Sequence, residues 1–115
     1  MRVFLTFLML VIGATSAAAK EKYNTGFMAE LKSLGLEREA FLYALNWAGA
    51  GHSLAERHVV EALIDGKGVE PNPKAAIALA CRSQIMTEYD RHRLVLFANL
   101  RLTNGDTDPV QCEKN

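Results

Sequence analysis

The chain has 115 residues, and its 13 basic residues balance its 13 acidic residues. A balanced charge without a concentrated basic patch argues against nucleic-acid binding and against electrostatic attachment to a membrane surface. The length suits one domain with a modest core.

Residues 1–19 have the layout of a secretory signal peptide. Arg2 gives a positive start, Val3–Ile12 is an apolar run interrupted by one threonine, and Ala17–Ala19 supplies the small residues that signal peptidase reads. The run is shorter than the roughly 20 apolar residues of a membrane-spanning helix. We therefore expect cleavage after about Ala19, a periplasmic or secreted protein, and no stable membrane insertion afterwards.

The rest of the chain has helical periodicity. Apolar residues recur at three- and four-residue steps, and no alternation typical of strands occurs. We expect an N-terminal flanking helix within 20–36 and a helical domain over 37–115. The pattern predicts an all-α fold with helices at 37–49, 54–65, 73–86 and 88–103.

Local signals mark the helix starts. Ser53, with Glu56 three residues on, has the pattern of a capping box for the helix at 54–65. Asn72 is a favourable N-cap for the next helix, because Pro73 then occupies the first position, where a missing N–H costs nothing. Both signals predict short helices separated by tight turns.

A shift of about 36 residues aligns the chain with itself, which indicates an internal repeat. The matched residues include Ala40 with Ala76, Ala44 with Ala80, Ala62 with Ala98, and Asn72-Pro73 with Asp108-Pro109. Alanine at one recurring helical position lets two helix backbones approach closely, as stacked helical hairpins require.

Residues 38–52, the loop Gly66-Lys67-Gly68-Val69 and the following Ala75-Ala76 resemble the Sel-one-like repeat, a tetratricopeptide relative of about 36 residues. The resemblance covers residues 38 to about 84 and fades from Glu88 onward. It implies a short tetratricopeptide-like stack of helical hairpins, an α-α superhelix of about two units plus a flanking helix.

The glycine loop has a structural interpretation of its own. Gly66 and Gly68 permit positive φ and a tight reversal between antiparallel helices, and Val69 is then placed to plug the end of the hairpin core. A β-branched residue at either glycine is expected to strain the turn.

Cys81 and Cys112 are the two cysteines of the chain. In an oxidising compartment such a pair is a candidate disulfide, whereas in the cytoplasm it would be two buried thiols. If Cys112 begins a last helix beside the helix that bears Cys81, the two sulfurs come near each other.

No constellation of residues points to catalysis, a cofactor or a metal. Ser53 and Ser83 lack the motif of an activated nucleophile, and His58 and His92 lack a third ligand at metal-site spacing. Gly66-x-Gly68 has neither the preceding strand nor the following residues of a phosphate loop. We therefore expect a non-enzyme without cofactor or bound metal.

The resemblance implies a protein–protein interaction module, an adaptor or regulator of another exported protein. A small inhibitor or immunity protein that blocks a periplasmic enzyme fits the same features. In stacked hairpins the first helix of each unit lines the concave surface, which here means 54–65 and 88–103. The expected contacts with a partner protein are Arg57, His58, Glu61, Arg91 and Asn99.

Overall fold

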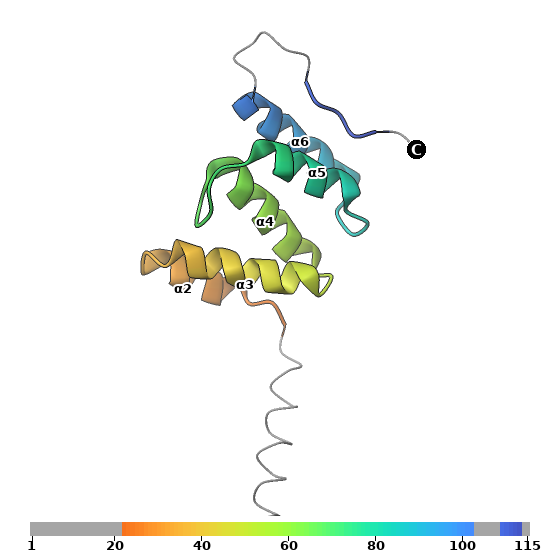
Figure 1. Cartoon of the computed structure of the whole chain (residues 1–115). Helices are drawn as coiled ribbons and strands as arrows, with labels where there is room; N and C mark the ends of the chain where they lie inside the picture. The colour runs from red at the N-terminus through yellow and green to blue at the C-terminus, as the bar shows by residue number, and fades with distance from the viewer. Residues whose placement is uncertain (1–21, 103–108, 114–115) are drawn as a thin grey trace, which may run out of the picture.

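The computed structural model describes residues 22–102 and 109–113, and these residues contain α-helices and no strand. The predicted all-α fold is confirmed. The helices are α2 (Thr25–Ser33), α3 (Glu37–Gly49), α4 (Ser53–Asp65), α5 (Pro73–Arg82) and α6 (Glu88–Leu102) (Figure 1). The predicted signal peptide and its cleavage site lie outside the described residues, as does Asp108 of the repeat alignment.

The helices pack as hairpins around α4, which crosses the middle of the molecule between the α2/α3 pair and the α5/α6 pair (Figure 1). Val59 and Val60, adjacent in sequence, are both almost fully buried but in different clusters. Val59 packs with Tyr23, Met28 and the alanines of α3, and Val60 packs with residues of α5 and α6. One helix thus joins two small cores, because its apolar residues occupy more than one face.

Four of the alanines that the internal repeat matches lie at the helix contacts. Ala40 and Ala44 of α3 are each 1% exposed, and Ala76 and Ala80 of α5 are fully buried. Their small side chains let α3 and α5 pack closely against neighbouring helices, as the repeat predicts.

The start of α5 follows the sequence prediction. Asn72 is its N-cap, the side-chain oxygen accepts from the backbone N–H of Ala75 at 3.1 Å, and Pro73 is the first helical residue. The capping box predicted for α4 is wrong. His52 is the N-cap there and makes no side-chain capping bond, while the carboxylate of Glu56 accepts a hydrogen bond from the hydroxyl of Ser83 instead.

α5 ends at Arg82, four residues before the predicted end at Met86. The hydroxyl of Ser83 accepts from the backbone N–H of Met86 at 2.9 Å, so it competes with helix continuation. The guanidinium of Arg91 donates to the carbonyls of Ala80 at 3.0 Å and Ser83 at 2.7 Å. These long-range bonds satisfy the last carbonyls and fix the turn into α6.

The glycine loop after α4 is a close junction between hairpins. Gly66 ends α4 in the left-handed region at φ 74°, and Gly68 also has a positive φ, 78°. A Cβ at Gly68 would lie 2.1 Å from the carbonyl oxygen of Glu37, at the start of α3. Two physical requirements therefore demand glycine at position 68, the left-handed backbone and the contact with α3.

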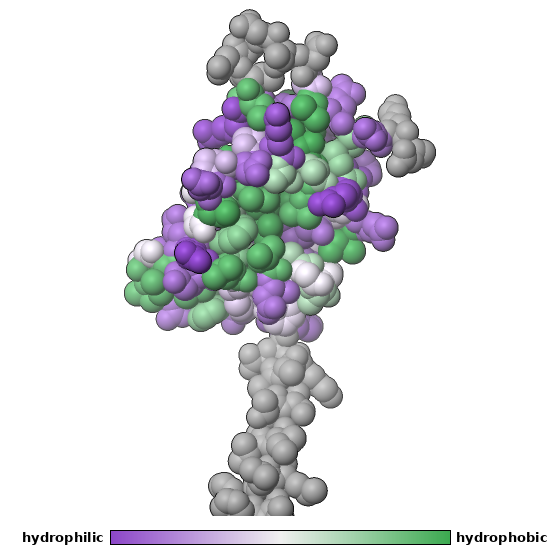
Figure 2. All heavy atoms as spheres, in the orientation of Figure 1, coloured by the Kyte–Doolittle hydropathy of each residue, from purple (hydrophilic) through white to green (hydrophobic). Residues whose placement is uncertain are grey.

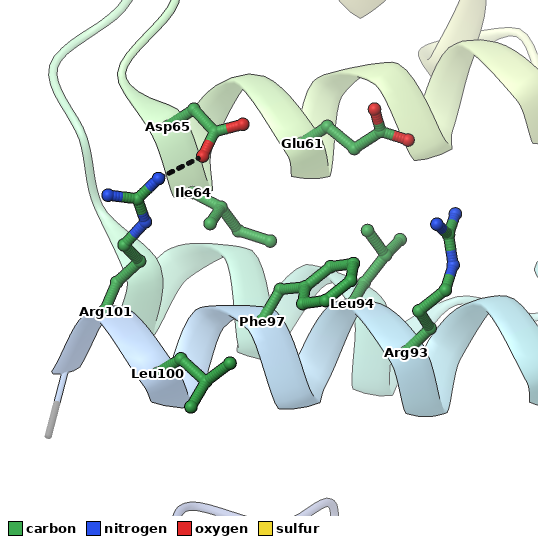
Figure 3. A pocket seen from close by; sticks show the side chains of 8 residues that line it. All are labelled: Glu61, Ile64, Asp65, Arg93, Leu94, Phe97, Leu100 and Arg101. Carbon is green, nitrogen blue, oxygen red and sulfur yellow. Dashed lines mark hydrogen bonds and ion pairs between the residues drawn. The ribbon is translucent and has the colours of Figure 1, made fainter. Parts of the chain in front are cut away.

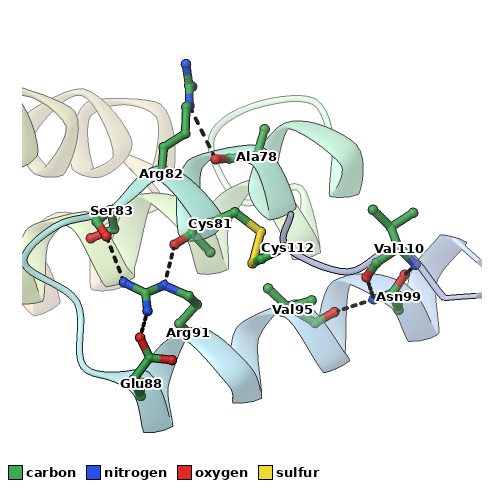
Figure 4. The surroundings of a disulfide bond; sticks show 11 residues. Ala78, Cys81, Arg82, Ser83, Glu88, Arg91, Val95, Asn99, Val110 and Cys112 are labelled. Carbon is green, nitrogen blue, oxygen red and sulfur yellow. Dashed lines mark hydrogen bonds and ion pairs between the residues drawn. A yellow bond between two sulfur atoms is a disulfide. The ribbon is translucent and has the colours of Figure 1, made fainter. Parts of the chain in front are cut away.

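The chain end is tied back to the helices by a disulfide between Cys81 and Cys112, with the two Cα atoms 5.3 Å apart (Figure 4). The candidate bridge is therefore present. Cys112 does not begin a helix: Pro109–Glu113, hereafter the strap, is without regular secondary structure and runs along α6. The strap thus brings the two sulfurs together without the last helix that was considered at Cys112.

Part of the outer surface remains apolar. Figure 2 shows apolar residues gathered across the middle of one face, where α3, α4 and α5 meet, with hydrophilic residues toward its edges. Leu42 and Leu45 on α3 are among the exposed large side chains. Within residues 22–102 and 109–113, no helix has both the length and the apolar character needed to cross a bilayer.

Candidate partner-binding groove

A hollow of about 380 Å³ lies between α4 and α6, and we refer to it as the α4–α6 groove (Figure 3). Its walls come from the two helices alone. The lining residues are Glu61, Ile64, Asp65, Arg93, Leu94, Phe97, Leu100 and Arg101.

The two walls run parallel, and one contact between them has the spacing of the internal repeat. Arg101 donates to the carboxylate of Asp65 at 3.0 Å, and these residues are 36 positions apart in the sequence. Toward the other end of the groove, Arg57 lies 4.0 Å from the carboxylate of Asp90. Residue numbers thus rise together along both helices, so equivalent helices of successive units lie side by side, as a stack of hairpins requires.

The groove has a buried floor and an exposed apolar wall. Ile64 and Leu94 are 4% and 1% exposed, whereas Phe97 is 43% exposed and Leu100 is 65% exposed. Figure 3 places Phe97 between the two helices, with Arg93 beside it. The guanidinium of Arg93 lies 5.7 Å from the centre of the Phe97 ring, a cation–π contact that holds both side chains at the groove edge.

Charged side chains that form ion pairs with one another surround this apolar wall. Besides the Asp65–Arg101 pair, Arg57 and Glu61 are 3.1 Å apart on α4, and Arg93 lies 3.9 Å from Asp90. Exposed pairs of this kind typically contribute only about 0–1 kcal/mol to stability. Such charges can therefore exchange their partners for those of a docking protein at little cost to the fold.

A smaller hollow of about 110 Å³ lies on the other side of the same α4 surface, toward α2 and α3. Glu61 and Asp65 line both hollows, and Met28, Lys32 and His58 contribute to the smaller one. The outer face of α4 is therefore flanked by a depression on each side, with Glu61 and Asp65 between them.

Two of the five predicted contact residues lie at the surface, and the other three make contacts within the fold. Arg57 and Glu61 lie on the outer face of α4, as the sequence pattern predicts, and Glu61 lines the groove.

His58 is half-buried, and its Nδ1 shares a hydrogen bond with the hydroxyl of Tyr23. Its ring lies 5.6 Å from the Tyr23 ring, in an aromatic cluster that includes Tyr43. His58 therefore links α4 to the segment before α2.

Both members of this hydrogen bond favour their neutral forms. Burial raises the pKa of Tyr23 to about 12, with smaller contributions from Tyr43 and Glu61. Burial lowers the pKa of His58 below its ordinary value of 6.5, opposed by Glu61 and reinforced by Lys32. The neutral imidazole of His58 can accept a hydrogen bond from the Tyr23 hydroxyl at Nδ1, so the hydrogen bond and the pKa directions agree.

Stability is expected to fall in acid through His58. Because its pKa is lower in the folded chain, the unfolded chain takes up the proton first as the pH drops below 6.5. The free energy of unfolding should decrease below that pH, and the contribution of His58 should be complete above it. Urea unfolding on both sides of pH 6.5 should show a smaller acid loss in His58→Gln than in the wild-type protein. An unchanged acid loss in the variant would contradict this assignment.

Arg91 and Asn99 do not have the outward positions expected of them. Asn99 is 7% exposed, and its side-chain amide bonds to the strap at Val110. The side chain of Arg91 is 17% exposed and is directed to carbonyls of the α5–α6 turn, besides its ion pair with Glu88 (Figure 4). Both side chains are therefore engaged in contacts within the fold, and neither lines the α4–α6 groove.

Several groove residues were absent from the predicted contact set, namely Asp65, Arg93, Phe97, Leu100 and Arg101. The repeat alignment contained a signal for them, since a shift of 36 pairs Asp65 with Arg101 and Glu61 with Phe97. The sequence prediction selected other charged and polar residues of the two helices and so did not include these positions. An exposed phenylalanine on a helix otherwise looks like a core residue.

Within the described part of the chain, no group of three or more histidine, cysteine, aspartate or glutamate side chains is arranged to hold a metal ion. Comparisons of the chain with protein-family models, with curated proteins and with solved structures found no match. The function must therefore be argued from the geometry of the groove.

Proposed function

We propose that this protein is a non-enzymatic interaction module that is periplasmic or secreted. It binds another exported protein through the α4–α6 groove. The observation that carries the proposal is the exposed Phe97 and Leu100 beside a groove with a charged rim. Large apolar side chains at the centre of a polar rim are typical of protein-binding surfaces.

Two further features support the proposal. The disulfide between Cys81 and Cys112 fits a protein that works in an oxidising compartment. The parallel arrangement of α4 and α6 in a repeat register fits a helical-repeat protein related to the Sel-one-like family, in which the first helices of successive units form the binding surface.

The test is site-specific photo-crosslinking of the exported protein in its native cells. A photoreactive phenylalanine analogue at Phe97 is expected to give a discrete adduct with one protein, which mass spectrometry identifies. Glu61→Lys should reduce that adduct strongly, because it replaces a rim carboxylate with a positive charge while leaving the helix intact. If the captured protein is an enzyme, its activity in the purified complex distinguishes an inhibitor from an adaptor.

Leu42 provides the matched control, since it is 49% exposed on α3 and lies outside the groove. The same analogue at Leu42 should give no discrete adduct. An adduct at Leu42 alone would locate binding on the exposed side of α3, and no adduct at either position would contradict the interaction module.

A further inference from the structure

The strap is held on α6 through its backbone. The side-chain Nδ2 of Asn99 donates to the carbonyl of Val110 at 2.7 Å, and the N–H of Val110 donates to Oδ1 of Asn99 at 2.8 Å (Figure 4). Nδ2 also donates to the carbonyl of Val95 at 3.0 Å, which fixes the amide in place. A buried amide thus pairs with both polar groups of one extended residue, as a neighbouring β-strand would.

The second attachment is covalent and lies two residues further along. Cys112 bonds to Cys81 at the end of α5, with a Cα–Cα distance of 5.3 Å. Because both hydrogen bonds between Asn99 and Val110 use backbone atoms of Val110, this pairing does not depend on the side chain there. The site therefore selects an extended segment with a cysteine two positions after the paired residue.

The strap fills only part of the surface on which it lies. A cleft of about 630 Å³ remains between the strap and α6, with the side chains of Val95, Leu96 and Val110 among its walls. Leu96 is 53% exposed and Val110 is 45% exposed. A segment with larger apolar side chains than those of the strap would bury more of this surface.

We propose that the strap site is a second binding site, which accepts an extended, cysteine-containing segment of a partner protein in place of the chain's own strap. The partner's thiolate attacks Sγ of Cys81, and the bond between Cys81 and Cys112 breaks as the new disulfide forms. Cys112 leaves as a thiolate and takes up a proton, so the exchange needs no oxidant or reductant. Asn99 positions the incoming backbone so that its cysteine meets Cys81.

The probe is a synthetic peptide with the sequence of residues 107–115. Incubation of the intact disulfide-bonded protein with an excess of the thiol peptide is expected to give an adduct at Cys81 with Cys112 free, which mass spectrometry of thiol-blocked digests detects. In a second arm, full-length Cys112→Ser reacts with the peptide carrying thionitrobenzoate on its cysteine. Cys81 displaces the coloured leaving group, and the release gives the rate of capture.

Backbone pairing is tested by methylating single peptide nitrogens. N-methylation at the valine removes the N–H that donates to Oδ1 of Asn99. Capture should then slow about tenfold, the ratio that corresponds to a loss of roughly 1.4 kcal/mol. N-methylation at the residue after the cysteine is the matched control and should leave the rate unchanged. These modifications leave the protein untouched, so they separate binding from folding. Equal rates for all three peptides, or no adduct at Cys81 of the intact protein, would overturn the proposal.

A variant completes the test from the protein side. In the Cys112→Ser background, Asn99→Asp keeps the side-chain shape but removes the donor to the peptide carbonyl, so capture of the unmodified peptide should slow. Reaction of Cys81 with the small free thionitrobenzoate disulfide should keep its rate. Equal slowing of both reactions would show that the substitution changes the reactivity of the Cys81 thiol and would argue against a peptide site.

Discussion

Gly68→Ala should lower the free energy of unfolding by roughly 2–5 kcal/mol, the sum of a left-handed alanine and an overpacked contact. The backbone at Gly68 has φ 78°, and the new Cβ would lie 2.1 Å from the carbonyl oxygen of Glu37. Since that atom belongs to the backbone at the start of α3, the loop and α3 must move apart. Equilibrium urea unfolding followed by circular dichroism measures the loss.

Gly35 is the control that separates the two contributions. Its φ is 77°, but a Cβ there has no neighbour within 4 Å. Gly35→Ala should therefore cost only about 1–2 kcal/mol, the conformational part of the effect. Equal losses at the two glycines would mean that the loop after α4 does not press against α3.

Removal of the disulfide should have a comparable effect. Cys81 and Cys112 are 31 positions apart, and closure of such a loop contributes roughly 3–4 kcal/mol in the chain-entropy model. Cys112→Ser should therefore shift the urea midpoint strongly downward while α2–α5 remain helical, because the core contacts of these helices do not involve the strap.

The reducing agent provides the control for this second prediction. Reduction of the wild-type protein should reproduce the loss, and the same treatment should leave Cys112→Ser unchanged. Two free thiols in the unfolded, unreduced wild-type protein would show that the bridge does not form. A loss below about 1 kcal/mol would mean that strap contacts, including those of Asn99, replace the constraint.

The periodicity of the sequence indicated where the helices lie, and one cap signal indicated where α5 begins. Residues such as Asn72 and Pro73 act on their own neighbours, so the start of α5 could be predicted without knowledge of the fold. The recurrent alanines likewise indicated where helices touch, because a small side chain has the same effect wherever two helices meet. Both inferences rest on the properties of single residues and of their near neighbours in the sequence.

Only the tertiary structure decided which polar residues remain at the surface. Arg91 ends α5 by bonding to carbonyls eight and eleven positions away, and Asn99 pairs with the backbone of Val110. A helical pattern gives the direction of a side chain relative to its own axis, but it does not say whether another segment will cover that side. The groove depends on the same fact, because Phe97 becomes an exposed wall only where α6 lies parallel to α4 and no other helix of the described residues covers it.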